Sequence, residues 1–182
     1  FVGGVIKDAT PRRYVALLND QGMRIWENTG IKAEEIAGLT VAADGTAVAT
    51  GRIRTSAPNE PAAYDAGIWG YDLNGFAWAN QFARPLSDPL LDDFNEFSER
   101  GHGVLALPDG TVLVFGEREY HEAENAPKPY ARAWWQRYAT DGTRVGKPWT
   151  SPGFPFLHDG MRGGVVTADG FALAGWGRHE GK

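Results

Sequence analysis

The sequence predicts an all-β protein made of repeated four-stranded antiparallel units. Two observations support this fold class: a Gly-rich hairpin motif occurs three times, and a second short hairpin follows each copy or precedes it. No stretch of useful length shows helical periodicity. With 182 residues, 42% hydrophobic and 23% charged, the chain has the length and composition of one globular domain.

The first motif contains three glycines. The second lies seven residues after the first and belongs to an Asp-Gly pair, and the third follows five or six residues later. The three copies are Gly38 to Gly51 around Asp44-Gly45, Gly103 to Gly116 around Asp109-Gly110, and Gly163 to Gly175 around Asp169-Gly170. Runs rich in Val, Leu and Ala flank each pair, so two buried strands joined by a tight turn are expected. Because both residues tolerate positive φ, Asp-Gly predicts a type I′ turn.

A second hairpin alternates with the first. Its turns are Gln21-Gly22, Asn74-Gly75 and Asp141-Gly142, and each is followed by a tryptophan, at Trp26, Trp78 and Trp149. Apolar and polar residues alternate loosely in the flanking runs, as in half-buried strands. We expect the recurring tryptophans to pack between neighbouring units.

One unit therefore holds four strands and about 60 residues. The expected units are residues 1–38, 39–101, 102–161 and 162–182 of one repeat domain, the first and last being partial. Units of this kind predict a β-propeller-type array of about three four-stranded blades, either alone or as part of a larger or oligomeric propeller. A β-sandwich or a stack of hairpins is the alternative.

The pattern resembles bacterial β-propeller repeats of the delta-60 and PQQ-like types. The resemblance is carried by Tyr14 to Trp26 with Gly38 to Gly51, Ile68 to Trp78 with Gly103 to Gly116, and Trp134 to Trp149 with Gly163 to Gly175. It implies a propeller fold and an extracellular or periplasmic location. It implies no particular activity, because such repeats occur in adhesins, scaffolds and enzymes.

Composition narrows the function classes. Cysteine is absent, which excludes disulfides, thiolate metal sites and a cysteine nucleophile. The net charge of −5 does not favour nucleic acid. No apolar run is long enough for a membrane span.

Long connections are expected at 52–65, 83–101, 117–130 and 154–161, all at the end of the units opposite the tight turns. Loops on a rigid scaffold commonly carry binding residues. Arg100, His102 and Arg162 stand before expected strands, with His158 and Asp159 nearby, and together they can bind an anionic or sugar ligand. The alternative is that they satisfy carbonyl groups at strand ends.

Tyr130, Trp134 and Trp135 form an aromatic stretch with ligand-binding potential. Adjacent residues of a strand face opposite sides, so one of the two tryptophans is expected in the core and the other nearer the surface. An exposed tryptophan can stack on a sugar or contact a protein.

The acidic stretch Asp88, Asp92, Asp93 and Glu96 offers oxygen ligands for Ca²⁺. It does not have EF-hand spacing, and a solvated acidic loop is the preferred interpretation. We expect no other metal and no cofactor.

The favoured function is a non-catalytic binding or adhesion module that contacts a protein or a carbohydrate. The alternatives are a structural subunit, which associates with itself or with the rest of a longer chain, and a propeller enzyme of hydrolase or quinoprotein-like type. No nucleophile motif identifies catalytic residues.

Overall fold

A computed structural model describes residues 1–7, 11–30, 34–56, 63–82, 96–121, 130–151 and 157–179. These residues form thirteen strands and no helix, which confirms the all-β prediction. The strands are β1 (Val2–Ile6), β2 (Arg12–Leu18), β3 (Arg24–Thr29), β4 (Glu34–Val41), β5 (Ala47–Arg54), β6 (Tyr64–Asp72), β7 (Gly75–Gln81), β8 (Glu96–Ala106), β9 (Val112–His121), β10 (Tyr130–Tyr138), β11 (Arg144–Thr150), β12 (Leu157–Thr167) and β13 (Gly170–His179).

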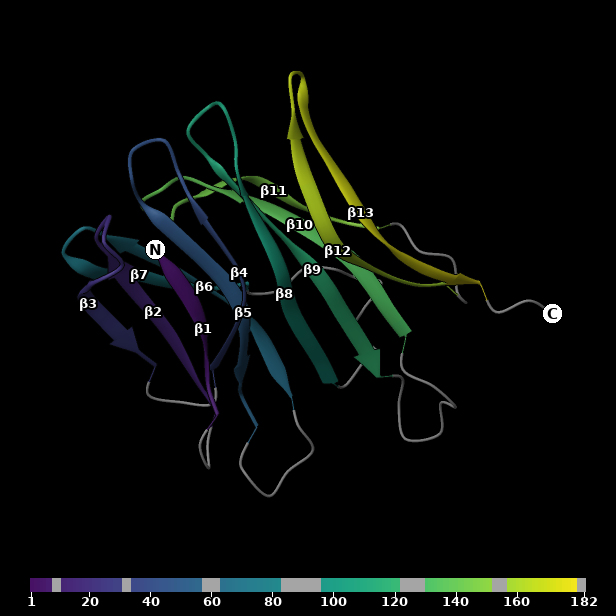
Figure 1. Ribbon diagram of the computed structural model, residues 1–182. Coiled ribbons are helices and arrows are strands. Elements are labelled where there is room, and N and C mark those ends of the chain that lie inside the picture. Colours follow the sequence, from purple (N-terminus) through teal and green to yellow (C-terminus); the bar gives the residue numbers. More distant parts are fainter. Residues whose placement is uncertain are drawn as a thin grey trace.

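The strands form four antiparallel sheets in chain order (Figure 1). Two sheets have four strands each, β4-β5-β6-β7 and β8-β9-β10-β11. A three-stranded sheet, β1-β2-β3, precedes them, and a two-stranded sheet, β12-β13, follows. Every strand pairs with its neighbour in sequence, so the chain runs up and down within each sheet.

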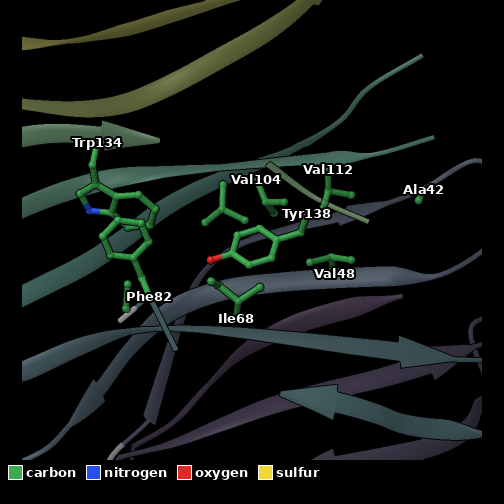
Figure 2. Close-up of a cluster of buried hydrophobic side chains, with 10 residues drawn as sticks. Ala42, Val48, Ile68, Phe82, Val104, Val112, Trp134 and Tyr138 are labelled. Atoms are coloured by element: carbon green, nitrogen blue, oxygen red, sulfur yellow. The ribbon is translucent and has the colours of Figure 1, made fainter. Parts of the chain in front are cut away.

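The sheets pack face to face, and the apolar cores lie between them. One core joins the two four-stranded sheets, where Val48 and Ile68 meet Val104, Val112 and Trp134 (Figure 2). A second core joins the sheet β4–β7 to β2, where Val15 meets residues of β5 and β6. Successive residues of β5 enter opposite cores, because side chains alternate along a strand. The continuous apolar run Ala47–Ala49 is therefore buried on both faces, as predicted.

The six predicted tight turns are present, with a positive φ at Gly22, Gly45, Gly75, Gly110, Gly142 and Gly170. The type I′ prediction for Asp-Gly is wrong. In the described part of the chain only glycines have positive φ, whereas a type I′ turn needs it at two successive residues.

At Asp44-Gly45 the loop has three residues, closed by Gly45 N donating to Ala42 O (3.0 Å) and Ala42 N donating to Thr46 O (2.8 Å). Such a loop needs a left-handed residue only at the glycine. The side chain of Asp44 then accepts a hydrogen bond from Thr46 N (2.9 Å), and Asp109 and Asp141 repeat this contact.

Trp26 and Trp78 occupy equivalent positions and join neighbouring sheets, as predicted. Trp26 Nε1 donates to Leu73 O (3.0 Å), and Trp78 Nε1 donates to Thr140 O (2.7 Å). The prediction fails for Trp149. By strand register Val145, opposite Arg137, occupies the equivalent position. Trp149 instead stacks on Trp135 in its own sheet, with ring centroids 6.3 Å apart.

Candidate functional site

The first strands of three consecutive sheets carry the same irregularity. The register of β4 with β5 shifts at Ala37, that of β8 with β9 shifts at His102, and that of β12 with β13 shifts at Arg162. A β-bulge of this kind leaves one residue unpaired and redirects its side chain. His102 and Arg162 thus lie inside strands, which corrects the prediction that they stand before them: the strands extend into the expected connections.

A glycine stands opposite each bulge, and the structure gives the reason. A Cβ atom added at Gly51 would lie 1.7 Å from Glu35 O, at Gly116 1.8 Å from Arg100 O, and at Gly175 2.1 Å from Gly160 O. These distances are far below van der Waals contact, so only glycine allows the bulged strand to approach this closely. The third glycine of the sequence motif is therefore a requirement of the bulge.

The bulges surround a cavity of about 230 Å³, called the bulge cavity below. It is lined by Glu35, Ile36, Ala37, Gly51, Arg52, Arg100, Gly101, His102 and Arg162. These residues belong to β4, β5, β8 and β12, so three sheets contribute to the wall. Its residues on β4 and β5 lie toward the strand ends away from the tight turn, the side where the sequence predicted binding residues.

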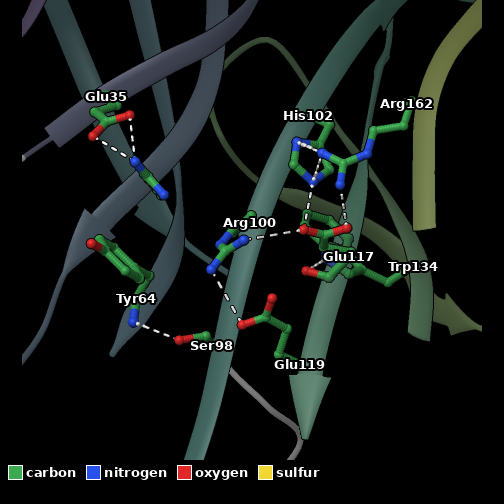
Figure 3. Close-up of polar contacts among 10 residues, drawn as sticks. Glu35, Tyr64, Ser98, Arg100, His102, Glu117, Glu119, Trp134 and Arg162 are labelled. Carbon is green, nitrogen blue, oxygen red and sulfur yellow. Dashed lines mark hydrogen bonds and ion pairs between the residues drawn. The ribbon is translucent and has the colours of Figure 1, made fainter. Parts of the chain in front are cut away.

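Glu117 of β9 contacts three of the four basic residues that line the cavity (Figure 3). Its carboxylate accepts contacts from Arg100 Nη1 (3.4 Å), His102 Nε2 (3.2 Å) and Arg162 Nη2 (2.8 Å), and its side chain is only 3% exposed. Burial by itself would raise the pKa of Glu117, but the hydrogen bond from His102 and the charges of His102, Arg162 and Arg100 outweigh it and hold that pKa below its usual value. The carboxylate therefore stays charged and orients three side chains.

His102 contacts both Arg162 and Glu117. Arg162 Nη1 lies 3.1 Å from His102 Nδ1 and 2.9 Å from Nε2. His102 Nε2 also lies 3.2 Å from Glu117 Oε1. Because Arg162 lies on β12 and His102 on β8, this chain of contacts also links two sheets.

On the opposite wall the same strand positions carry the opposite charges. Glu35 of β4 faces Arg52 of β5 in register, just as Arg100 of β8 faces Glu117 of β9. Arg52 Nη2 donates to both carboxylate oxygens of Glu35, at 2.7 and 2.8 Å. Tyr64 of β6 lies beside both arginines, with its ring centroid 4.7 Å from Arg52 Cζ and 5.8 Å from Arg100 Cζ.

Of the residues predicted to bind a ligand, the structure brings Arg100, His102 and Arg162 together and separates Asp159 from them. Asp159 accepts hydrogen bonds from Ser151 Oγ (2.7 Å) and from Ala133 N, so it ties β12 to the preceding sheet. Asp159 also lies within β12 rather than in the expected loop, as does the backbone of His158, whose side chain is outside the described residues.

The aromatic stretch has a structural role in this fold. Trp134 is fully buried, stacks on Phe82 with ring centroids 4.1 Å apart, and donates from Nε1 to Glu117 O (3.0 Å). Trp135 is partly exposed, as predicted for one of the two adjacent tryptophans, and its ring lies against Trp149 and Phe171. The Tyr130 backbone starts β10, and its side chain lies outside the described residues.

The calcium candidates Asp88, Asp92 and Asp93 also lie outside the described residues, and of Glu96 only the backbone, in β8, is described. Within the described ranges no group of three or more His, Asp or Glu side chains is placed to hold a metal ion. Those ranges also contain no helix of the length and apolarity that crossing a membrane requires.

Sequence reasoning did not predict that five further residues adjoin this site: Glu35, Arg52, Glu117, Glu119 and Tyr64. The sequence holds a signal for two of them. Arg52 and Glu117 each follow the third glycine of the motif, so aligning two motif copies places a basic residue against an acidic one. Glu119 contacts Arg100 Nη2 at 3.2 Å. Tyr64 has no such signal, since it follows a long connection of irregular sequence.

Comparisons with known proteins identify no relative. No protein-family model matches the sequence, and no curated protein matches it at a significant level. The functional argument therefore depends on the geometry of the bulge cavity.

Proposed function

We propose that this chain forms part of a β-propeller-type array and serves as a non-catalytic binding module, which takes a protein or carbohydrate ligand at the bulge cavity. One observation carries the proposal: three equivalent bulges direct side chains of consecutive sheets to the same cavity. The resemblance to secreted propeller repeats adds an extracellular or periplasmic location to the proposal.

The stacking of the sheets supports the propeller-type arrangement. The first strands β4, β8 and β12 contact each other in sequence order, while the later strands of each sheet pack on the next sheet. In a propeller the first strands of successive blades surround the axis, and ligands bind where loops and strand ends meet around it. The bulge cavity has the corresponding position among β4, β8 and β12.

The contacts within the cavity support binding rather than catalysis. Arg52, Arg100, His102 and Arg162 are each held by a carboxylate, so they form a fixed array of hydrogen-bond donors. Side chains fixed before a ligand arrives lose little entropy on binding. The cavity is thus suited to recognising a polar group.

An NMR titration of the ¹⁵N-labelled chain with panels of glycans and peptides tests this function. We expect a ligand of either kind to shift the amide signals of Ala37, His102 and Arg162 together. Arg162→Gln is expected to weaken that binding, whereas the control Arg137→Gln is not, because Arg137 pairs with Asp109 at a tight turn. Ligands that shift only amides remote from the bulges would contradict the proposal.

A second candidate function, assembly through sheet association, has its own observation. Two large apolar side chains of the two-stranded sheet are exposed: Val165 of β12 is 58% exposed, and Trp176 of β13 is 38% exposed. Sheets of a stacked array cover each other's apolar side chains, so a second copy of the chain can pack on this sheet. Light scattering distinguishes the outcomes: a dimer mass that Val165→Glu reduces to 19.8 kDa supports assembly, and a monomer at all concentrations excludes self-association.

A further inference from the structure

We infer that the group bound in the bulge cavity is the carboxylate of a sugar acid, held by Arg100 and Arg162, with hydroxyl groups of the same ring donating to Glu35. This inference rests on the proposed function and adds the class of ligand to it. Four features of the cavity support it: an unsatisfied donor, a replaceable carboxylate, the balance of charges and the small volume.

The first feature is the incomplete hydrogen bonding of Arg100. Its Nε is buried and has no hydrogen-bond partner among the described residues. Its other contacts are long, 3.4 Å to Glu117 and 3.2 Å to Glu119. A buried donor without a partner is costly, and a carboxylate is the group that a guanidinium binds best, through two parallel hydrogen bonds. A ligand carboxylate can therefore replace one of these long contacts on Arg100.

The second feature is that the two acidic partners of Arg100 differ in exposure. The Glu117 side chain is 3% exposed and is fixed by three basic groups, whereas that of Glu119 is 28% exposed. Glu119 can turn toward solvent at little cost, because a partly exposed ion pair with a long contact contributes little stability. A ligand carboxylate can thus replace Glu119 on Arg100 while Glu117 keeps Arg100 and Arg162 in place.

The third feature is the charge balance. Three arginines, Arg52, Arg100 and Arg162, face three carboxylates, Glu35, Glu117 and Glu119. When Glu119 turns away, three arginines face two carboxylates, and the arginines are in excess by one charge. One ligand carboxylate neutralises this charge, whereas a doubly charged phosphate would leave an excess of negative charge next to Glu117 and Glu35.

The fourth feature is the size and polarity of the walls. The volume of about 230 Å³ is below the roughly 300–1,000 Å³ of pockets for drug-sized ligands, so one ring fits better than a long oligomer segment. Glu35 is 33% exposed and only accepts hydrogen bonds, which suits ligand hydroxyls, while Ile36 and Ala37 provide a small apolar wall. A hydroxylated ring with one carboxylate satisfies all of these groups.

Isothermal titration with sodium glucuronate tests the inference, with glucose, sodium acetate and inorganic phosphate as comparison ligands. We expect glucuronate to bind at least about tenfold more tightly than glucose, which lacks the carboxylate, and than acetate, which lacks the hydroxyls. Phosphate binding equal to or tighter than glucuronate binding would overturn the inference. Titration with a trimer of galacturonate separates a free sugar acid from a glycan-terminal one: tighter binding by the trimer favours the glycan.

Two variants with opposite expected effects make the test specific. Arg162→Gln should weaken glucuronate binding about tenfold, whereas Glu119→Gln should strengthen it several-fold, because the competing carboxylate is removed. Arg137→Gln is the matched control, and far-UV circular dichroism confirms that each variant is folded. Weaker binding by Glu119→Gln would contradict the replacement of Glu119 by the ligand.

The failures of the two proposals can be separated by the NMR titration. If peptides or neutral glycans shift the amides of Ala37, His102 and Arg162 and glucuronate does not, the sugar-acid inference is wrong and the binding function stands. If no ligand of any class shifts these amides, both proposals are wrong.

Discussion

The two four-stranded sheets use the same strand positions for different ionic contacts. In the sheet β4–β7, Glu35 forms an ion pair with Arg52 of the same sheet. In the sheet β8–β11 the charges are reversed: Arg100 contacts Glu117, and Glu117 also contacts Arg162 of the next sheet. One position earlier in the first strands, Glu34 and Glu99 also differ. Glu34 pairs with Arg13 of the preceding sheet, and Glu99 pairs with Arg118 of its own sheet, at 2.7 and 2.6 Å.

The cross-strand neighbour explains this difference. Glu34 lies opposite Ile53, which offers no charge, so its carboxylate turns to Arg13 of the neighbouring sheet. Glu99 lies opposite Arg118 and is paired within its own sheet. The backbone scaffold is repeated, and single residues on the second strand decide whether a charge stays within its sheet or connects two sheets.

The largest expected effect tests what the two sheets share. Gly116→Ala should destabilise the chain by about 3 kcal/mol, because its Cβ would lie 1.8 Å from Arg100 O and the bulged strand must move. Gly51→Ala should cost a similar amount. Urea denaturation measures both, with Gly163→Ala as the control, since nothing lies within 4 Å of its Cβ. A tolerated Gly116→Ala would show that the bulge adapts.

The second prediction concerns the buried acid Glu99. Burial, assisted by the charge of Asp65 and opposed by Arg118, raises its pKa to about 7. A carboxyl group with a raised pKa in the folded state contributes stability at low pH and loses it as the pH rises through that value. The free energy of unfolding should thus fall by about 2 kcal/mol between pH 5 and pH 8 through this group.

Glu99→Gln provides the control for this pH dependence. The variant removes the titrating group, so the fall between pH 5 and pH 8 should become smaller whatever the absolute stability of the variant. Parallel stability curves for the two proteins would show that Glu99 does not titrate in this range.

The third prediction compares the two ion pairs of the bulge cavity. Glu117→Gln should destabilise the chain by between about 1 and 2 kcal/mol, because a buried carboxylate holds three basic side chains. Glu35→Gln should cost less than about 1 kcal/mol, since its pair with Arg52 is one-third exposed. Thermal unfolding measures both variants, and equal costs would remove the proposed distinction between the two sheets.

The fourth prediction concerns a contact that does not differ between the sheets. Trp78→Phe removes the hydrogen bond to Thr140 O (2.7 Å), and Trp26→Phe removes the equivalent bond to Leu73 O (3.0 Å). Each substitution should cost about 1 kcal/mol in urea denaturation. If one variant loses more than twice as much free energy of unfolding as the other, the two sheet interfaces are not equivalent.

Much of the fold could be predicted because it depends on local chemistry. The tight turns need glycine at a left-handed position, and the buried strands need apolar residues on both faces, so both leave a repeating pattern in the sequence. The turn type was predicted wrongly because a three-residue loop and a type I′ turn both favour Asp-Gly.

The site was only partly predictable. The sequence positions of Arg100, His102 and Arg162 identify them as candidates, but the same pattern places Glu117 in a connection, whereas it lies in β9. The bulges shift the register by one residue, and a shift of this size has no separate signal in a pattern of apolar residues. Trp134 was a binding candidate, and packing against Phe82 of the neighbouring sheet buried it.

By itself the sequence determined the all-β class, the alternation of short hairpins and the glycines opposite the bulges, because backbone conformation and strand burial depend on residues close together in the chain. Only the tertiary structure decided which charges meet. Glu117 and Arg162 are 45 residues apart in sequence and belong to different sheets, and their contact depends on how those sheets stack. Stacking is set by the sum of many apolar contacts, which no short segment encodes.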